Sequence, residues 1–366
     1  MARPRAPEPA AVEYGIVKST KPHVLALVIT GLVLGAISGI DSWADSDLPR
    51  IRFIATGGTI ATRGGTRMSA EEVLQLVPGL QRHARPEPEQ FANVASTAMT
   101  LDQWVQLARR INEVFDHDPG LTGAVITSGT DSLEELAYFL HLTVKTAKPV
   151  VLVGAMRNAG ALGYEGPANL LDAFRVAASA ESRGKGVLVV MNDEINSARE
   201  VAKTDALRVQ TFQSRPYGIL GVVDPDRVVY YRDPLKRHTQ KAEFDLSTVT
   251  SLPRVDIMMF YQGASSDLLH ASVDAGAKGI VIAVAGADLT GGSLGPGISY
   301  AERQGVVVVA ATRTGSGRIA AQSATRVRDG MIGGEDLTPL KARILLMLAL
   351  TKTQSPTEIQ RMFTEY

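Results

Sequence analysis

Two short threonine-containing turns are the first places in the sequence where chemistry is expected. The segment Thr56–Ala61 reads Thr-Gly-Gly-Thr-Ile-Ala and directly follows an apolar run that ends at Ala55. Its two glycines let the backbone approach a ligand closely, and its threonine hydroxyls can act as nucleophiles. The same residues also fit a phosphate-binding turn or a purely structural one, although the lysine of a P-loop is missing.

The second turn is Thr127–Ser132, which reads Thr-Ser-Gly-Thr-Asp-Ser and also follows an apolar run. Ligands bind at the carboxyl ends of strands in open α/β sheets, so Thr130 and Asp131 are candidates for proton transfer. Aspartate and threonine also cap helices very often, and capping explains these two residues equally well. Ser132 followed by Glu135 predicts a capping box at the start of a helix.

Two weaker candidates follow later apolar runs. Ala155 lies in Val153–Arg157, where its backbone could meet a ligand, but a plain exit from a strand explains this segment better. Lys203 lies in Arg199–Thr204, and a lysine in such a segment is normally a solvated surface charge. It becomes catalytic only if it is partly buried beside Asp131, where it could handle a proton.

The elements around these turns indicate the fold class. From Ile51 onward, short β-branched apolar runs alternate with longer stretches of helical period, which is the pattern of an α/β fold with parallel strands and crossover helices. Because each run is apolar along most of its length, each predicts a strand that is buried on both faces. The expected strands are Ile51–Ala55, Ala124–Thr127, Val150–Val153, Val187–Met191, Val255–Phe260, Ile280–Ala285 and Val306–Ala310.

Composition excludes several kinds of site. The chain of 366 residues has no cysteine, which rules out thiolate catalysis, cysteine metal sites and disulfides. Its six histidines have no metal-ligand spacing, so we expect no bound metal. Lys plus Arg and Asp plus Glu both number 38, which gives no basic footprint for nucleic acid and favours small molecules as partners.

The first 44 residues are expected to direct export. A segment with four basic residues, Met1–His23, precedes the apolar run Val24–Ile40, and small residues follow at Ser42 and Ala44. This order is typical of a signal peptide, and an uncleaved N-terminal anchor is the alternative. Either segment would place the rest of the chain outside the cytosol, and membrane contact is expected only if the segment is retained.

The chain is long enough for two domains. Between Arg232 and Arg254 the sequence becomes charged and is broken by prolines, which indicates a linker, although an exposed hairpin loop would look similar. We therefore expect one domain over residues 45–233, a linker over 234–254 and a second domain over 255–366.

Taken together, the motifs resemble those of the bacterial type II (periplasmic) L-asparaginases. The resemblance extends from about Leu48 to Tyr366, and the motifs taken together in this order are far more specific than any single motif. The blocks that carry it are Thr56–Ala61, Ile126–Leu140, Lys148–Arg157, Gly186–Asp193 and Lys341–Thr351.

The resemblance implies a hydrolase with a larger N-terminal mixed or parallel sheet domain flanked by helices and a smaller C-terminal parallel-sheet domain. It also implies a homotetramer with active sites at subunit interfaces, and no cofactor. By this resemblance Thr59 is the nucleophile, and Thr130, Asp131 and Lys203 handle protons. The residues implied in substrate binding are Gly58, Ser96, Thr97, Gly129 and Ala155.

Several positions depart from the family pattern. The segment Thr62–Ala70 is short and has no tyrosine, where family members usually carry one in a mobile lid. Ser128 replaces a common histidine, and Thr97 stands where a glutamine often helps to bind the substrate. The turn Ala285–Asp288 differs from the usual Gly-Asn-Gly-Asn, and the glutamate lent by the neighbouring subunit has no clear match around Ala320–Thr325.

These departures concern substrate recognition more than proton transfer. The leading expectation is hydrolysis of L-asparagine to L-aspartate and ammonia in the periplasm. Two alternatives stay open: hydrolysis of another small amide, such as L-glutamine or a D-amino-acid amide, and a periplasmic amino-acid-binding protein with weak catalysis.

Overall fold

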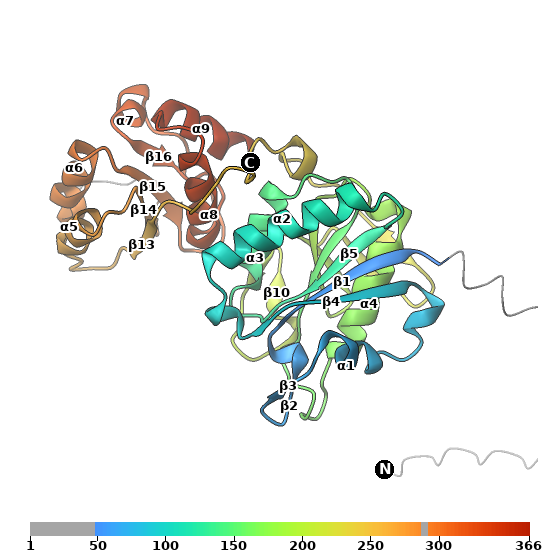
Figure 1. Cartoon of the computed structure of the whole chain (residues 1–366). Helices are drawn as coiled ribbons and strands as arrows, with labels where there is room; N and C mark the ends of the chain where they lie inside the picture. Colours follow the sequence, from blue (N-terminus) through green and yellow to red (C-terminus); the bar gives the residue numbers. More distant parts are fainter. Residues whose placement is uncertain (1–47, 287–291) are drawn as a thin grey trace, which may run out of the picture. The chain divides into compact units, whose positions relative to one another are not determined.

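The structure is a computed structural model that describes residues 48–286 and 292–366 (Figure 1). The predicted signal peptide or anchor and part of the turn Ala285–Asp288 lie outside the described residues. Within residues 48–286 and 292–366, no helix is both long and apolar enough to cross a membrane.

The first sheet has eight strands in the order β12-β11-β8-β7-β6-β5-β1-β4. The neighbours from β4 to β7 are parallel, whereas β8, β11 and β12 pair antiparallel, so the sheet is mixed. Its strands are β1 (Arg50–Gly57), β4 (Arg85–Val94), β5 (Gly123–Thr127), β6 (Val150–Val153), β7 (Val187–Met191), β8 (Glu194–Ser197), β11 (Gly221–Val223) and β12 (Val228–Tyr230).

Helices cover both faces of this sheet (Figure 1). Because side chains alternate along a strand, β1 sends Ile54 into the core formed with α2 and α3, and Phe53 into the core formed with α1 and α4. The Phe53 ring lies 5.8 Å from that of Phe174 on α4. The helices are α1 (Ala70–Gln75), α2 (Leu101–His117), α3 (Leu133–Thr143) and α4 (Gly166–Ala178).

The second sheet is smaller and entirely parallel, with the order β13-β14-β15-β16. The α/β fold with a larger mixed sheet followed by a smaller parallel one is therefore confirmed. The boundary over residues 234–254 stays a prediction. The elements are β13 (Val255–Met259), α5 (Asp267–Asp274), β14 (Gly279–Val284), α6 (Gly295–Arg303), β15 (Val307–Thr312), α7 (Ala324–Arg328), β16 (Met331–Gly333), α8 (Pro339–Leu350) and α9 (Pro356–Glu365).

Every expected strand is present, but four of the first sheet and one of the second were missed. Strand β4 lacks an apolar run because it contains two prolines and several charged residues. It lies at the edge of the sheet, where a proline that cannot donate to a neighbour is tolerated. The missed strands are β4, β8, β11, β12 and β16.

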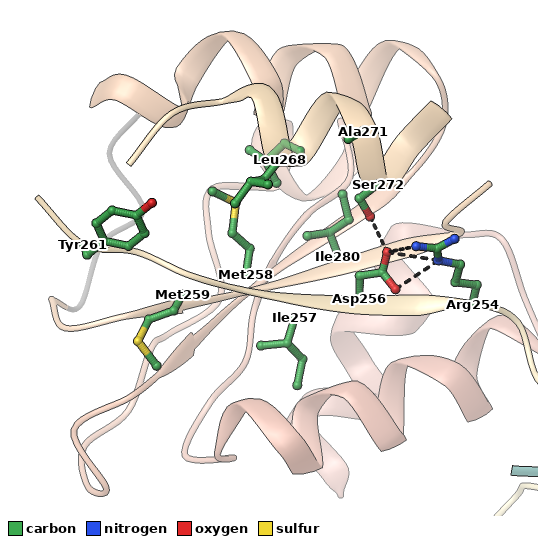
Figure 2. A pocket seen from close by; sticks show the side chains of 11 residues that line it. Arg254, Asp256, Ile257, Met258, Met259, Tyr261, Leu268, Ala271, Ser272 and Ile280 are labelled. Atoms are coloured by element: carbon green, nitrogen blue, oxygen red, sulfur yellow. Dashed lines mark hydrogen bonds and ion pairs between the residues drawn. The ribbon is translucent and has the colours of Figure 1, made fainter. Parts of the chain in front are cut away.

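The expectation that every strand is buried on both faces is wrong for β13. Met258 is 7% exposed and lies on the side of Leu268 of α5, whereas Ile257 and Met259 lie on the opposite side and are 37% and 60% exposed (Figure 2). Strand β13 has a neighbour in the sheet on one side only. Apolar sequence alone does not distinguish such an edge strand from a central one.

Two adjacent methionines of β13 provide a matched test of this difference. Met258→Ala is expected to lower the free energy of unfolding by about 2–5 kcal/mol, because it leaves a cavity under α5. Met259→Ala should change it by no more than about 0.5 kcal/mol. Urea unfolding of both variants makes the comparison, and an equal loss from Met259→Ala would mean that this face of β13 is covered in solution.

Candidate functional site

Most of the residues implied by the resemblance surround one cavity of about 100 Å³. The cavity lies where β1 and β5 end, and these strands are parallel neighbours. Its lining residues are Gly58, Thr59, Thr62, Arg67, Ala95, Ser96, Gly129, Thr130 and Asp131. The two threonine turns, about 70 positions apart in the chain, therefore meet at one site.

Hydrogen bonds between the two strand ends hold the turns together. The Thr56 hydroxyl donates to the Thr127 carbonyl at 2.6 Å, and the Thr56 amide donates to the Thr127 hydroxyl at 3.2 Å. All of these groups are buried, so each satisfies a polar atom that water cannot reach. The Thr56 hydroxyl, which the sequence offered as a possible nucleophile, is thus structural, as is the Thr127 hydroxyl.

Glycine is required in the first turn because of close backbone packing. Gly58 has a φ of +85°, and a β-carbon there would lie 2.4 Å from the Gly129 amide nitrogen. A side chain would push the two turns apart. The Gly58 amide itself donates to the Val94 carbonyl at 3.0 Å, so it is not available to stabilise an oxyanion.

Lys203 meets the condition that would make it catalytic. It lies on the two-residue strand β9 (Ala202–Lys203), which pairs with β10 (Phe212–Gln213). Its amine donates to the Thr130 hydroxyl at 3.1 Å and to the Asp131 carboxylate at 2.7 Å. The Lys203 side chain is 18% exposed and that of Asp131 is 65% exposed, so the pair lies at the rim of the cavity with the amine on the inner side.

Glu134 is part of this arrangement and was not expected from the sequence. Its carboxylate accepts a hydrogen bond from the Lys203 amide at 3.2 Å. Because Glu134 lies on α3, which starts just after Asp131, it ties the backbone of Lys203 to the element that carries Thr130 and Asp131. Burial raises the pKa of Glu134, and the nearby amine of Lys341 partly opposes that rise.

Lys341 on α8 fixes the segment that leads into Lys203. Its amine is buried and donates to the carbonyls of Arg199 (2.9 Å) and Val201. The Arg199 guanidinium in turn binds both carboxylate oxygens of Asp336 at 2.7 Å. Burial lowers the pKa of Lys341 to about 8. Lys341 begins one of the blocks that carry the family resemblance, but no local signal in the sequence links it to Lys203.

The start of α3 differs from the expected capping box. The Ser132 side chain makes no capping bond and instead donates to the Ser96 carbonyl at 3.3 Å. Glu135, the other half of the expected box, lies 3.6 Å from Arg343. The Ser132 hydroxyl and the Glu135 carboxylate, which a capping box would need, are thus used by the Ser96 contact and the ion pair. Through that contact, Ser132 connects the second turn to the segment that carries Ser96.

Two of the expected substrate-binding residues do not line the cavity. Thr97 is exposed although its neighbour Ser96 is buried. Ala155 is fully buried among the residues packed against α1 and α4. A β-carbon at Gly154 would lie 3.2 Å from the Thr130 side chain, so the residue before Ala155 packs against this threonine. The roles of Thr97 and Ala155 stay predictions.

The segment where family members usually carry a lid forms a small hairpin here. It consists of β2 (Thr62–Arg63) and β3 (Thr66–Arg67). No tyrosine lies on it, but the Tyr164 hydroxyl donates to the Ile60 carbonyl at 2.6 Å. Burial, with a smaller contribution from Glu165, raises the pKa of Tyr164 to about 12. Tyr164 therefore supports the backbone after Thr59 from outside the hairpin.

A larger cavity, of about 610 Å³, lies between β13 and α5 (Figure 2). Its polar groups bind one another: Asp256 accepts from Arg254 at 2.9 Å and from the Ser272 hydroxyl at 2.7 Å. The rest of its lining is mostly apolar. The Ser272 hydroxyl therefore lies beside a carboxylate, but Arg254 binds the same carboxylate, and none of the residues implied by the family resemblance lines this cavity. Among the described residues, no group of three or more His, Asp or Glu side chains could hold a metal ion.

Known proteins match this chain along most of its length. Residues 50–236 match the family described as Asparaginase, N-terminal, and residues 254–363 match the Glutaminase/Asparaginase C-terminal domain. The chain belongs to the asparaginase family. The identification made from the sequence motifs, and with it an enzyme of the asparaginase class, is confirmed.

Individual relatives agree with this assignment. The chain is 42% identical over 341 residues to L-asparaginase 2 of Bacillus subtilis, with 90% of each chain covered. It is 38% identical over 361 residues to a glutaminase-asparaginase of Pseudomonas fluorescens, covering 95% of this chain and 99% of the relative. The crystal structure of a probable cytoplasmic L-asparaginase from Campylobacter jejuni is similar, with a TM-score of 0.80 and 42% identity over 87% of this chain and 100% of that one.

The buried amine of Lys341 generates a pH-dependent prediction for this asparaginase-family enzyme. Burial lowers its pKa from 10.5 to about 8, so between these values the unfolded chain binds more protons than the folded one. Stability contributed by this residue therefore rises as the pH increases through that window. The free energy of unfolding of the wild type, minus that of Lys341→Met, should increase from pH 8 to pH 10.5.

Urea unfolding of both proteins at several pH values in this window measures the difference in free energy of unfolding. The titration of the other groups cancels because both proteins contain them. Lys278→Met, at an exposed lysine, is the control and should show no such trend. A difference between wild type and Lys341→Met that stays flat, or that falls, would show that the amine is not desolvated in the folded protein.

Proposed function

We propose that this enzyme hydrolyses the side-chain amide of L-asparagine to L-aspartate and ammonia, with Thr59 as the nucleophile. The observation that carries the proposal is the amine of Lys203, which lies 3.1 Å from the Thr130 hydroxyl and 2.7 Å from the Asp131 carboxylate beside the cavity that Thr59 lines. Family membership supports the reaction class.

The reaction proceeds in two halves with a balanced proton inventory. The Thr59 oxygen bonds to the amide carbon, the C–N bond breaks, and the leaving nitrogen takes a proton from Thr130 and departs as ammonia. Lys203 refills Thr130, and the proton that Thr59 loses restores Lys203. Water then attacks the resulting ester, which releases L-aspartate and restores the Thr59 hydroxyl. The net change is one amide and one water converted into one carboxylic acid and one ammonia.

We infer that Thr130 relays the proton. Because Lys203 donates to the Thr130 oxygen, that oxygen is an acceptor and its own hydrogen is free to point elsewhere. Thr130 can thus give its proton to the leaving nitrogen and recover one from the Lys203 amine. Asp131 holds the amine in place and, with its exposed side chain, offers a counter-charge for the ammonium group of the substrate.

L-Glutamine is a second candidate substrate. The specific observation in its favour is the glutaminase-asparaginase of Pseudomonas fluorescens, which is 38% identical to this chain over nearly the whole length of both. The exposed position of Thr97, together with the absence of a tyrosine from the hairpin, favours a pocket that differs in substrate preference from the family pattern.

Export to the periplasm and assembly into a homotetramer are further parts of this proposal. The order of charged and apolar residues before Ser42 supports export, whereas the similar Campylobacter protein is named as cytoplasmic. The tetramer, with active sites at subunit interfaces, rests on the family resemblance. Cell fractionation tests the first, and light scattering of the purified protein tests the second.

The nucleophile is tested by Thr59→Ala. In a coupled assay that detects ammonia, the wild-type protein should release ammonia from L-asparagine, and Thr59→Ala should lose about a thousandfold or more of that rate. Its melting temperature should stay close to that of the wild type. A panel of L-asparagine, L-glutamine and D-asparagine ranks the substrates. If no amide is turned over but L-asparagine raises the melting temperature, the protein is a binding protein.

The proton relay is tested by removing the amine. Lys203→Met is expected to lower kcat by about 10²- to 10⁴-fold, the usual range for a general acid or base, with a smaller effect on KM. Lys278→Met is the matched control at an exposed lysine and should have wild-type kinetics. A Lys203→Met protein that keeps its kcat would exclude the amine from the reaction.

A further inference from the structure

Arg67 is a cavity-lining residue that neither the sequence motifs nor the family resemblance assigned to substrate. It lies on β3 of the hairpin, and its side chain lines the same cavity as Thr59, Ser96 and Asp131. Its guanidinium donates to the Gly58 carbonyl at 3.4 Å. Because Gly58 packs against the Gly129 backbone, this contact places the guanidinium near the point where the two turns meet.

The charge of Arg67 is not used elsewhere in the described part of the chain. Within residues 48–286 and 292–366, no Asp or Glu oxygen forms an ion pair with it, and the bond to Gly58 is the one hydrogen bond its guanidinium makes. By contrast, Arg50, Arg110 and Arg199 each bind a carboxylate at 2.7 Å or less. Arg67 thus retains donors for a ligand.

The contact with Gly58 is too weak to be the reason for an arginine at this position. Its length of 3.4 Å exceeds the roughly 2.9–3.0 Å that is usual for an N–H···O hydrogen bond. The same carbonyl already accepts from the Thr62 hydroxyl at 2.9 Å. Removing the guanidinium would therefore leave no unsatisfied group in the turn.

We propose that Arg67 is a specificity residue that binds the free carboxylate of the substrate and so restricts the enzyme to amides that carry one. The inference rests on the proposed function and names the substrate class of that site. A planar guanidinium with several donors suits a carboxylate, which it can bind through two parallel hydrogen bonds. Asp131 at the same cavity suits an ammonium group, so the lining is complementary to a zwitterionic amino-acid amide.

Three amides that differ by one group separate this role from a structural one. L-Asparagine has both charged groups, succinamate lacks the ammonium, and 3-aminopropanamide lacks the carboxylate. Arg67→Gln should lower kcat/KM about 10- to 100-fold for L-asparagine and succinamate, as expected for the loss of charge-assisted hydrogen bonds. It should change kcat/KM for 3-aminopropanamide less than about twofold.

Arg63→Gln is the matched control, because Arg63 is on the same hairpin but is exposed and does not line the cavity. It should have wild-type values for all three amides, and Arg67→Lys should recover part of the loss. An equal loss on all three amides in Arg67→Gln would mean that the arginine supports the turn, and the proposal would be overturned.

Binding in the Thr59→Ala background separates this proposal from the proposed function, since it needs no turnover. Calorimetric titration with L-asparagine should give a Kd about 10- to 100-fold weaker when Arg67→Gln is added, and an unchanged Kd when Arg63→Gln is added. If wild type releases no ammonia but this difference remains, the hydrolase fails and the carboxylate site stands. An unchanged Kd in Arg67→Gln, or no binding of L-asparagine to Thr59→Ala, overturns the carboxylate site.

Discussion

The close approach of two strand ends is the constraint on which the site depends. Strands β1 and β5 are parallel neighbours, so their carboxyl ends open on the same edge of the sheet. The paired hydrogen bonds between Thr56 and Thr127 and the contact of Gly58 with Gly129 bring the turns closer than any side chain would allow. Thr59 and Thr130 can line one small cavity because the backbones of the two turns are in direct contact at Gly58 and Gly129.

The amine of Lys203 needs more support than the threonines, because β9 is only two residues long. That support comes from three charged side chains that are nearly buried: Glu134, Arg199 and Lys341. Buried charges are costly unless they are paired and hydrogen-bonded, and here each one binds backbone or an opposite charge. The domain of the second sheet thus contributes to the site through α8, although none of the described residues after 254 lines the cavity.

Sequence reasoning succeeded where one local signal is enough. Val150–Val153 and Val187–Met191 were located to the residue because a strand buried on both faces must be apolar throughout. It failed where the partner is distant or the position in the sheet matters: β4 tolerates its prolines only at an edge, and β13 exposes Met259 for the same reason. The sequence indicated Lys203 as a candidate but could not predict that its amine lies beside Asp131, because groups that position it, such as Lys341, lie about 140 residues away.

The hairpin of β2 and β3 is joined to the cavity by different contacts from those that hold Thr130 and Lys203. The bond between Lys203 and Thr130 and the bond between Thr56 and Thr127 involve no hairpin residue. The hairpin touches the site only through side chains such as Thr62 and Arg67 and through the Gly58 carbonyl. A change in this segment therefore acts first on the part of the lining that Thr62 and Arg67 provide, while the Ile60 carbonyl stays bound by Tyr164.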